Sequence, residues 1–203
     1  MSASELEAAF ARARNVHKRL HGLIDGLEVK ADLRARLSGG CFYVALDIQA
    51  AITLLCDNQI YPAAFILSRS VWEAYIRGTW LAECADPRWL DRFAKGDEPP
   101  QIGQMIEAIE RCPAFDAGVL SQAHGVAWQR FNGLTHIGAP LVLRCSTAEH
   151  FEADFDPQEV SEGLDHAAAV AILAALGIAK LANSGGVQTA LIELSLSHYP
   201  DAR

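Results

Sequence analysis

Long apolar runs of helical periodicity, divided by short breaks rich in proline, glycine and asparagine, constrain this chain more than any other feature. Hydrophobic residues recur every three to four positions in each run, which is the spacing of one face of an α-helix. No repeat and no alternating strand pattern accompanies the runs, and the best extended candidate is the short VLRC segment at 142–145. We therefore expect helices at about 4–26, 31–58, 62–85, 103–111, 117–137, 157–182 and 187–199.

Short connections between long helices favour neighbours that run in opposite directions. The sequence accordingly predicts an all-α fold, an antiparallel helical bundle of four to five long helices plus short ones, in a single domain over residues 1–203. With 51% hydrophobic and 21% charged residues, a chain of this length buries a core without disulfides or metal ions. Two consecutive glycines, Gly39 and Gly40, mark a candidate break in the second helix.

Charge and cysteine content narrow the class of function. The formal net charge of −8 repels phosphate groups. It therefore excludes nucleic-acid binding over a large basic surface but allows a small basic pocket. The 5 cysteines lie far apart without a CxxC pair, which indicates reduced thiols. The N-terminal residues lack an apolar signal core, and the apolar stretch at 167–179 is too short to span a bilayer. We expect a cytoplasmic protein without membrane contact.

One predicted helix carries charges where an apolar face is expected. Arg69, Glu73 and Arg77 lie one turn apart on a line of the helix at 62–85, whose other sides are apolar. Charged groups in such a helix must be paired, because an unpaired buried ion costs several kcal/mol. Two interpretations follow. The line is an internal salt-bridge ladder that fixes helix register, or Glu73 orients the guanidinium of Arg69 into a site.

The segment RFNGLTH at 130–136 is a second candidate for a polar site. On a helix, Asn132 and His136 are one turn apart, so the amide can hold one imidazole nitrogen and select its tautomer. Arg130 lies between this polar face and the apolar stripe of the same helix.

This segment resembles the signature of the HEPN superfamily of helical domains, an arginine followed a few positions later by a histidine. Arg130 and His136 have five residues between them, with Phe131 where the family usually has a polar residue. An Arg-x-x-x-Glu helix followed by an Asn-x-x-x-His helix is also similar to a group of uncharacterised bacterial HEPN-like proteins. The resemblance covers about residues 40–180, the expected HEPN-like core. The residues that match the second pattern are Arg69, Glu73, Asn132 and His136.

The resemblance implies a metal-independent endoribonuclease of a toxin–antitoxin, phage-defence or RNA-processing system. It also implies a homodimer, RNA as the substrate, and an antitoxin or other partner protein. In that scheme His136 moves protons at the 2′-hydroxyl or the leaving oxygen, Arg130 stabilises the phosphorane charge, and Asn132 positions His136. No cofactor is required. Other family members are noncatalytic interaction or binding modules, which is the alternative function, and an unrelated bundle that binds a small molecule is a third.

Two other groups of side chains were weighed as metal ligands. His17 and His21 have the one-turn spacing of a two-histidine metal face, but the basic residues around them favour a solvated basic face. The acidic segment at 149–156 lacks the glycine and the spacing of a calcium loop. The sequence predicts no metal site.

Overall fold

Nine α-helices build the part of the chain that the computed structural model describes, which comprises residues 3–115, 118–135, 137–146 and 150–198. No strand occurs within these residues, so the predicted all-α class is confirmed. The side chains of 127–133 and 135 lie outside the described part. The helices are α1 (Ala3–Ile24), α2 (Leu33–Asp57), α3 (Tyr61–Glu83), α4 (Pro87–Ala94), α5 (Ile102–Glu110), α6 (Val119–Thr135), α7 (Ala139–Arg144), α8 (Pro157–Leu181) and α9 (Gly185–His198).

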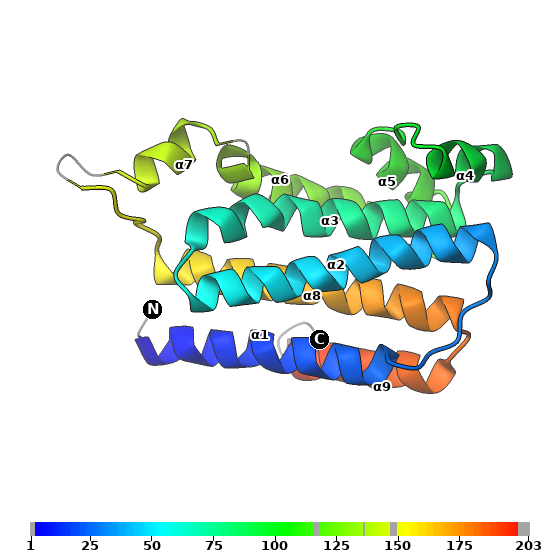
Figure 1. The fold of residues 1–203 in the computed structure, drawn as a ribbon, viewed down its shortest axis with the longest axis horizontal. Helices are drawn as coiled ribbons and strands as arrows, with labels where there is room; N and C mark the ends of the chain where they lie inside the picture. The colour runs from blue at the N-terminus through cyan, green and yellow to red at the C-terminus, as the bar shows by residue number, and fades with distance from the viewer. Residues whose placement is uncertain (1–2, 116–117, 136, 147–149, 199–203) are drawn as a thin grey trace.

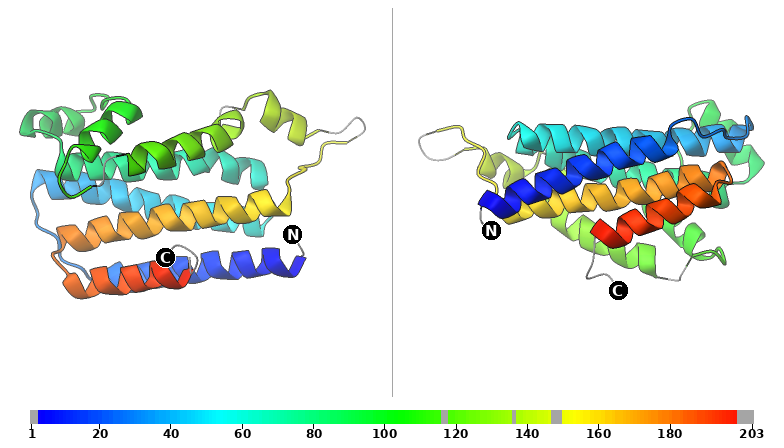
Figure 2. Two further views of the ribbon diagram at one scale, coloured as in Figure 1. Left: turned by 180° about the vertical axis from the view of Figure 1, so that it is seen from behind. Right: turned by 90° about the horizontal axis from the view of Figure 1, so that it is seen from below.

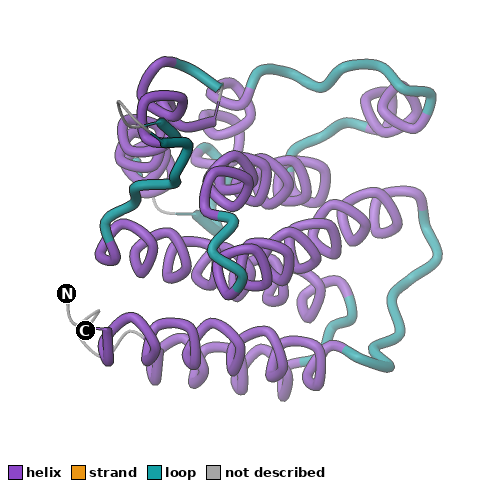
Figure 3. The backbone as a smooth tube through the Cα atoms, turned by 60° about the vertical axis from the view of Figure 1, so that its left-hand side comes forward, coloured by secondary structure: helices purple, strands orange, loops and turns teal. Residues whose placement is uncertain are grey.

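The long helices form an antiparallel bundle. Helices α1, α3 and α8 run in one direction, and α2, α6 and α9 run in the other (Figure 1). Helix α8 is central, because it packs against α1, α2, α3 and α9. The view from behind shows α1 and α9 on the same side of α8, and in the view from below they flank it (Figure 2). The short helices α4, α5 and α7 and the helix α6 lie beyond α3, joined by loops that Figure 3 draws in teal.

Small residues let four helices approach α8. Its buried positions are largely alanines, which bring neighbouring backbones close without leaving voids. By length and composition alone, α2 and α8 are each long and apolar enough to cross a membrane. Half of the most apolar stretch of α8 is buried inside the bundle, as expected of a core helix. Its alanines at 1% exposure or less are Ala167, Ala168, Ala171, Ala174, Ala175 and Ala179.

A single aromatic ring sets the spacing of three of these helices. Phe42 of α2 is 2% exposed and lies between Gly78 of α3 and Gly177 of α8. A Cβ atom at Gly78 would lie 2.6 Å from the ring, and one at Gly177 would lie 2.5 Å from it. Only glycine fits at either position while the phenyl group stays where it is, because carbon atoms pack at about 3.5–4.0 Å.

Arg34 joins the start of α2 to the end of α3. Its Nη1 donates to the carbonyl oxygen of Leu81 at 2.6 Å, and its Nη2 donates to that of Ala85 at 2.6 Å. These carbonyls belong to the last turn of α3 and the residues just beyond it, where helical carbonyl groups lack partners and the helix dipole favours a cation. The guanidinium therefore satisfies the C-terminal end of a core helix.

Two local expectations are wrong, and one short helix was not expected. Helix α2 continues through Gly39 and Gly40 without a break, because its packing against α3 and α8 overrides the low helix propensity of glycine. The VLRC segment is not extended, since its first three residues complete α7, which opens with Pro140 in its first turn. Helix α4 lies between the helices expected at 62–85 and 103–111, where no helix was expected, and Asp86 caps it by accepting a hydrogen bond from the backbone N–H of Trp89 at 3.0 Å.

Candidate functional site

The predicted charged line on α3 forms a linked set of ion pairs. The Nε of Arg69 donates to Oε1 of Glu73 at 2.6 Å, and Nη2 of Arg77 lies 3.6 Å from the other carboxylate oxygen. The side chains are 30%, 24% and 40% exposed for Arg69, Glu73 and Arg77, so the ion pairs are only partly buried. The charges lie on the side of α3 that the core helices leave partly open, while Val71 and Ile76 of the same helix are fully buried.

Trp72 connects this line to α6. Its indole Nε1 donates to Nδ1 of His124 at 3.1 Å, and the two rings are nearly parallel, with centroids 6.3 Å apart and an interplanar angle of 10°. Because an indole N–H only donates, Nδ1 of His124 acts as an acceptor, and the neutral ring carries its proton on Nε2. Burial lowers the pKa of His124, the Arg69 guanidinium lowers it further, and Glu73 opposes them. His124 is therefore a neutral imidazole beside the Arg69 guanidinium, which Glu73 orients.

A third ring reaches the same tryptophan from α8. The centroids of Trp72 and His166 are 6.3 Å apart, so the indole lies among ring contacts from both α6 and α8. A pocket of about 460 Å³ opens beside Trp72, with Val126 of α6 and Leu173 of α8 in its walls. Glu162, one turn before His166 on α8, also lines it. We call Arg69, Glu73, Trp72, His124 and His166 the α3–α6–α8 cluster.

The candidate catalytic residues are placed only in part. Arg130 and Asn132 belong to α6, but their side chains lie outside the described residues, as does the whole of His136. Helix α6 runs antiparallel to α3 and packs against it (Figure 1). Asn132 follows His124 by eight positions, which is about 12 Å along the helix axis. The segment therefore extends along α3 past the level of Arg69, and its convergence with that guanidinium stays a prediction.

Sequence reasoning missed the hydrogen bond between Trp72 and His124. The two residues are 52 positions apart, so no helical spacing in the sequence connects them. One general signal existed, since a buried tryptophan usually finds an acceptor for its indole N–H. It indicates that an acceptor is needed and does not say which residue supplies it.

Metal ligands do not gather in this cluster. Across the described ranges, no group of three or more histidine, cysteine, aspartate or glutamate side chains could hold a metal ion. His17 and His21 of α1 are in edge contact with ring centroids 4.6 Å apart, and burial lowers the pKa of His17.

The family of the chain follows from residues 42–202, which match the model of DUF6988, a family of unknown function. The chain belongs to this family. We found no significant similarity to a curated protein or to a solved structure. The matched residues include α3, α6 and α8, and so contain the whole α3–α6–α8 cluster, whereas α1 and the first turns of α2 precede the match.

Proposed function

We propose that this protein is a metal-independent endoribonuclease of the HEPN type whose RNA-binding face is formed by α3 and α6. The observation that supports this most directly is the ion pair between Arg69 and Glu73 at 2.6 Å, beside the helix that carries Arg130 and Asn132. A guanidinium held in this way is oriented before a phosphate arrives, which lowers the entropic cost of binding.

Local charge supports a phosphate ligand on this face despite the net charge of −8. Helix α6 contains no aspartate or glutamate between Val119 and Thr135. Arg69 and Arg77 of α3 together outweigh Glu73 by one positive charge, and the sequence of α6 adds Arg130. A compact positive region on an acidic protein favours one phosphate contact at a time and not a long nucleic-acid track.

The proposed chemistry is attack of a ribose 2′-hydroxyl on the adjacent phosphorus. His136 takes the 2′-hydroxyl proton or protonates the leaving 5′-oxygen, and Asn132 positions it. Arg130 stabilises the charge that develops on the phosphorane oxygens. The P–O5′ bond breaks as the P–O2′ bond forms, which yields a 2′,3′-cyclic phosphate and a free 5′-hydroxyl.

A noncatalytic interaction module is the second candidate. Its support is a set of large apolar side chains that are exposed to solvent on α6, on α7 and in the segments next to them. Where such side chains are contiguous, they mark contacts with other proteins. The exposed fractions are 61% for Val126, 68% for Ile137, 71% for Leu143 and 97% for Phe151.

RNA cleavage in the presence of EDTA tests the first proposal. The purified chain is incubated with total cellular RNA, and the 5′ and 3′ ends of the fragments are mapped. We expect fragments with 2′,3′-cyclic phosphates, a loss of about 10²–10⁴-fold in His136→Ala, and a comparable loss in Arg130→Ala. His150→Ala, which removes an exposed histidine outside the cluster, serves as the matched control.

Induction in cells extends the test to substrates that purified RNA lacks. Wild type that arrests growth while His136→Ala at equal soluble level does not would support catalysis. If wild type leaves RNA intact in both settings, the ribonuclease proposal fails. Sedimentation of the same samples shows whether the chain is the homodimer that the resemblance implies. Co-purification of a partner protein that depends on the exposed apolar side chains of α6 and α7 then tests the interaction module.

A further inference from the structure

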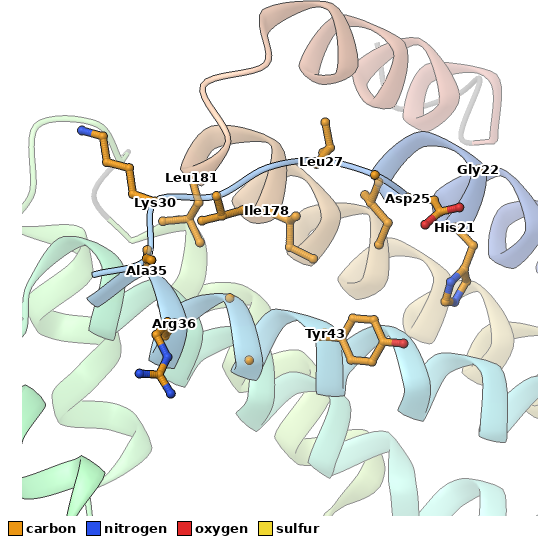
Figure 4. A pocket seen from close by; sticks show the side chains of 16 residues that line it. His21, Gly22, Asp25, Leu27, Lys30, Ala35, Arg36, Tyr43, Ile178 and Leu181 are labelled. Atoms are coloured by element: carbon orange, nitrogen blue, oxygen red, sulfur yellow. The ribbon is translucent and has the colours of Figure 1, made fainter. Parts of the chain in front are cut away.

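A pocket of about 840 Å³ lies at the opposite end of α1 from its N-terminus, away from the α3–α6–α8 cluster. The last turn of α1, the linker at 25–32 and the first turns of α2 enclose it, and the end of α8 forms its back (Figure 4). Its volume falls in the range of small-molecule sites, roughly 300–1,000 Å³.

Three helical glycines line this pocket, although no neighbouring atom requires a residue without a side chain at these positions. A Cβ atom at Gly22 or Gly40 would meet no atom within 4 Å, and one at Gly39 would meet only Leu181 at 3.6 Å, an ordinary contact. By contrast, Gly78 and Gly177 are explained by the ring of Phe42. Glycine weakens a helix relative to alanine, so its use at three positions around one cavity favours close approach of a ligand to the backbone.

The polar groups of the pocket lie at its two ends. Arg36 of α2 forms no ion pair among the residues that the structure describes, and it lines one end. His21 of α1 lines the other, although Nε2 of its ring is shielded from solvent. Tyr43, seven positions after Arg36 on α2, lies near the His21 end (Figure 4), so the two ends are about 10 Å apart.

The wall between these ends is apolar, with Leu27, Ile178 and Leu181 among its residues. Asp25 lies beside His21 (Figure 4), so a second anionic group is disfavoured at that end. A ligand that fits this lining has a carboxylate for Arg36, an apolar body for the wall and a neutral polar group for the end lined by His21 and Tyr43.

We propose that this pocket is a binding site for a medium-chain carboxylate that carries a neutral hydrogen-bonding group at its far end. The carboxylate pairs with Arg36, the chain lies along Leu27 and Ile178, and the terminal hydroxyl or carbonyl lies at the end lined by His21 and Tyr43. Most of the lining precedes the residues matched by the family model, so the site is independent of the proposed ribonuclease face.

Titration calorimetry of the full chain with three eight-carbon probes tests the proposal. The probes are 8-hydroxyoctanoate, octanoate, which lacks the terminal hydroxyl, and octylamine, which reverses the charge. We expect 8-hydroxyoctanoate to bind with a Kd below about 1 mM, octanoate to bind about tenfold more weakly, and octylamine not to bind. Arg36→Ala should weaken both carboxylates by about tenfold or more.

A filling variant separates the pocket from unspecific apolar binding. Gly40→Leu places a side chain in the empty space and should abolish binding, with folding checked by circular dichroism. Gly40→Ala, a smaller addition at the same position, controls for folding, and Arg88→Ala on α4, outside the pocket lining, is the control that should stay folded and still bind. Equal binding of octylamine, no saturable binding of either carboxylate, or binding that survives both Gly40→Leu and Arg36→Ala would each overturn the proposal.

Discussion

Replacing Gly177 by alanine should destabilise the protein by about 2 kcal/mol, although alanine is the better helix former. The added Cβ would lie 2.5 Å from Cε2, 2.6 Å from Cζ and 2.9 Å from Cδ2 of Phe42. Each contact is about 1 Å shorter than carbon atoms tolerate. The ring cannot retreat freely, since Gly78 presses on it from α3. Overpacking of this kind costs about 1–3 kcal/mol, and contacts this short place the cost near the upper end of that range. The better helix propensity of alanine returns about 1 kcal/mol, so the net destabilisation is about 2 kcal/mol.

Urea unfolding followed by circular dichroism at 222 nm measures the effect. The matched control is Gly40→Ala, because alanine at that position meets no atom within 4 Å. This variant should be about 1 kcal/mol more stable than wild type. The two glycine-to-alanine changes, both in long helices of the bundle, should therefore differ by about 3 kcal/mol in opposite directions.

A double-mutant cycle with Phe42→Ala identifies the cause. When the ring is absent, Gly177→Ala should become neutral or stabilising by up to about 1 kcal/mol, because only the propensity gain remains. If Gly177→Ala costs the same in both backgrounds, the ring is not the obstacle and the reasoning fails. A stabilised single variant would contradict the packing of the three helices around Phe42.

Three further predictions concern charged groups. Arg34→Ala should lower the free energy of unfolding by about 2–3 kcal/mol, because it leaves the C-terminal carbonyls of α3 without their charged donor. Urea titrations measure this change, and the control Arg36→Ala on the same helix should shift the free energy by less than about 0.5 kcal/mol. Glu73→Ala should lower the free energy of unfolding by about 1–2 kcal/mol, which is less than the 3–5 kcal/mol lost when a fully buried pair is broken. Thermal melting measures the loss, and the control Glu107→Ala, which removes an exposed ion pair, should melt close to wild type. The pKa of His124 is lowered in the folded chain, so the unfolded chain binds its proton first and stability falls as pH drops below about 6.5. His124→Gln should lose less stability than wild type between pH 8 and 5.5, and an identical pH dependence would contradict this account.

The helical class was predictable because its signals are local. The apolar run ahead of Lys180 and the turn at 58–62 fix where α8 ends and α3 begins within a few residues, and neither depends on distant contacts. The helix through Gly39 and Gly40 was not predictable, because its continuity depends on packing against α3 and α8. Propensity correctly marked these glycines as unusual, but only the structure shows that they border a pocket.

The candidate site shows the same division. The line of Arg69, Glu73 and Arg77 follows from one-turn spacing along a single helix, so the sequence predicted it and the structure joins its members. Its partial exposure depends on how far α6 covers α3, which no pattern within α3 encodes. The contact of Trp72 with His124 joins segments far apart in sequence, so only the packing of α6 on α3 determines it.

The ring of Phe42 has a consequence for how this chain can evolve. Its two glycine neighbours belong to different helices, so the three positions share one volume and cannot change independently. A larger residue at 78 or 177 becomes acceptable only after the aromatic side chain at 42 has been lost, and regaining the ring then requires both glycines to return. We expect relatives to show paired substitutions, with alanine or serine at 78 and 177 only where position 42 holds a smaller side chain, as an alignment of the family can test.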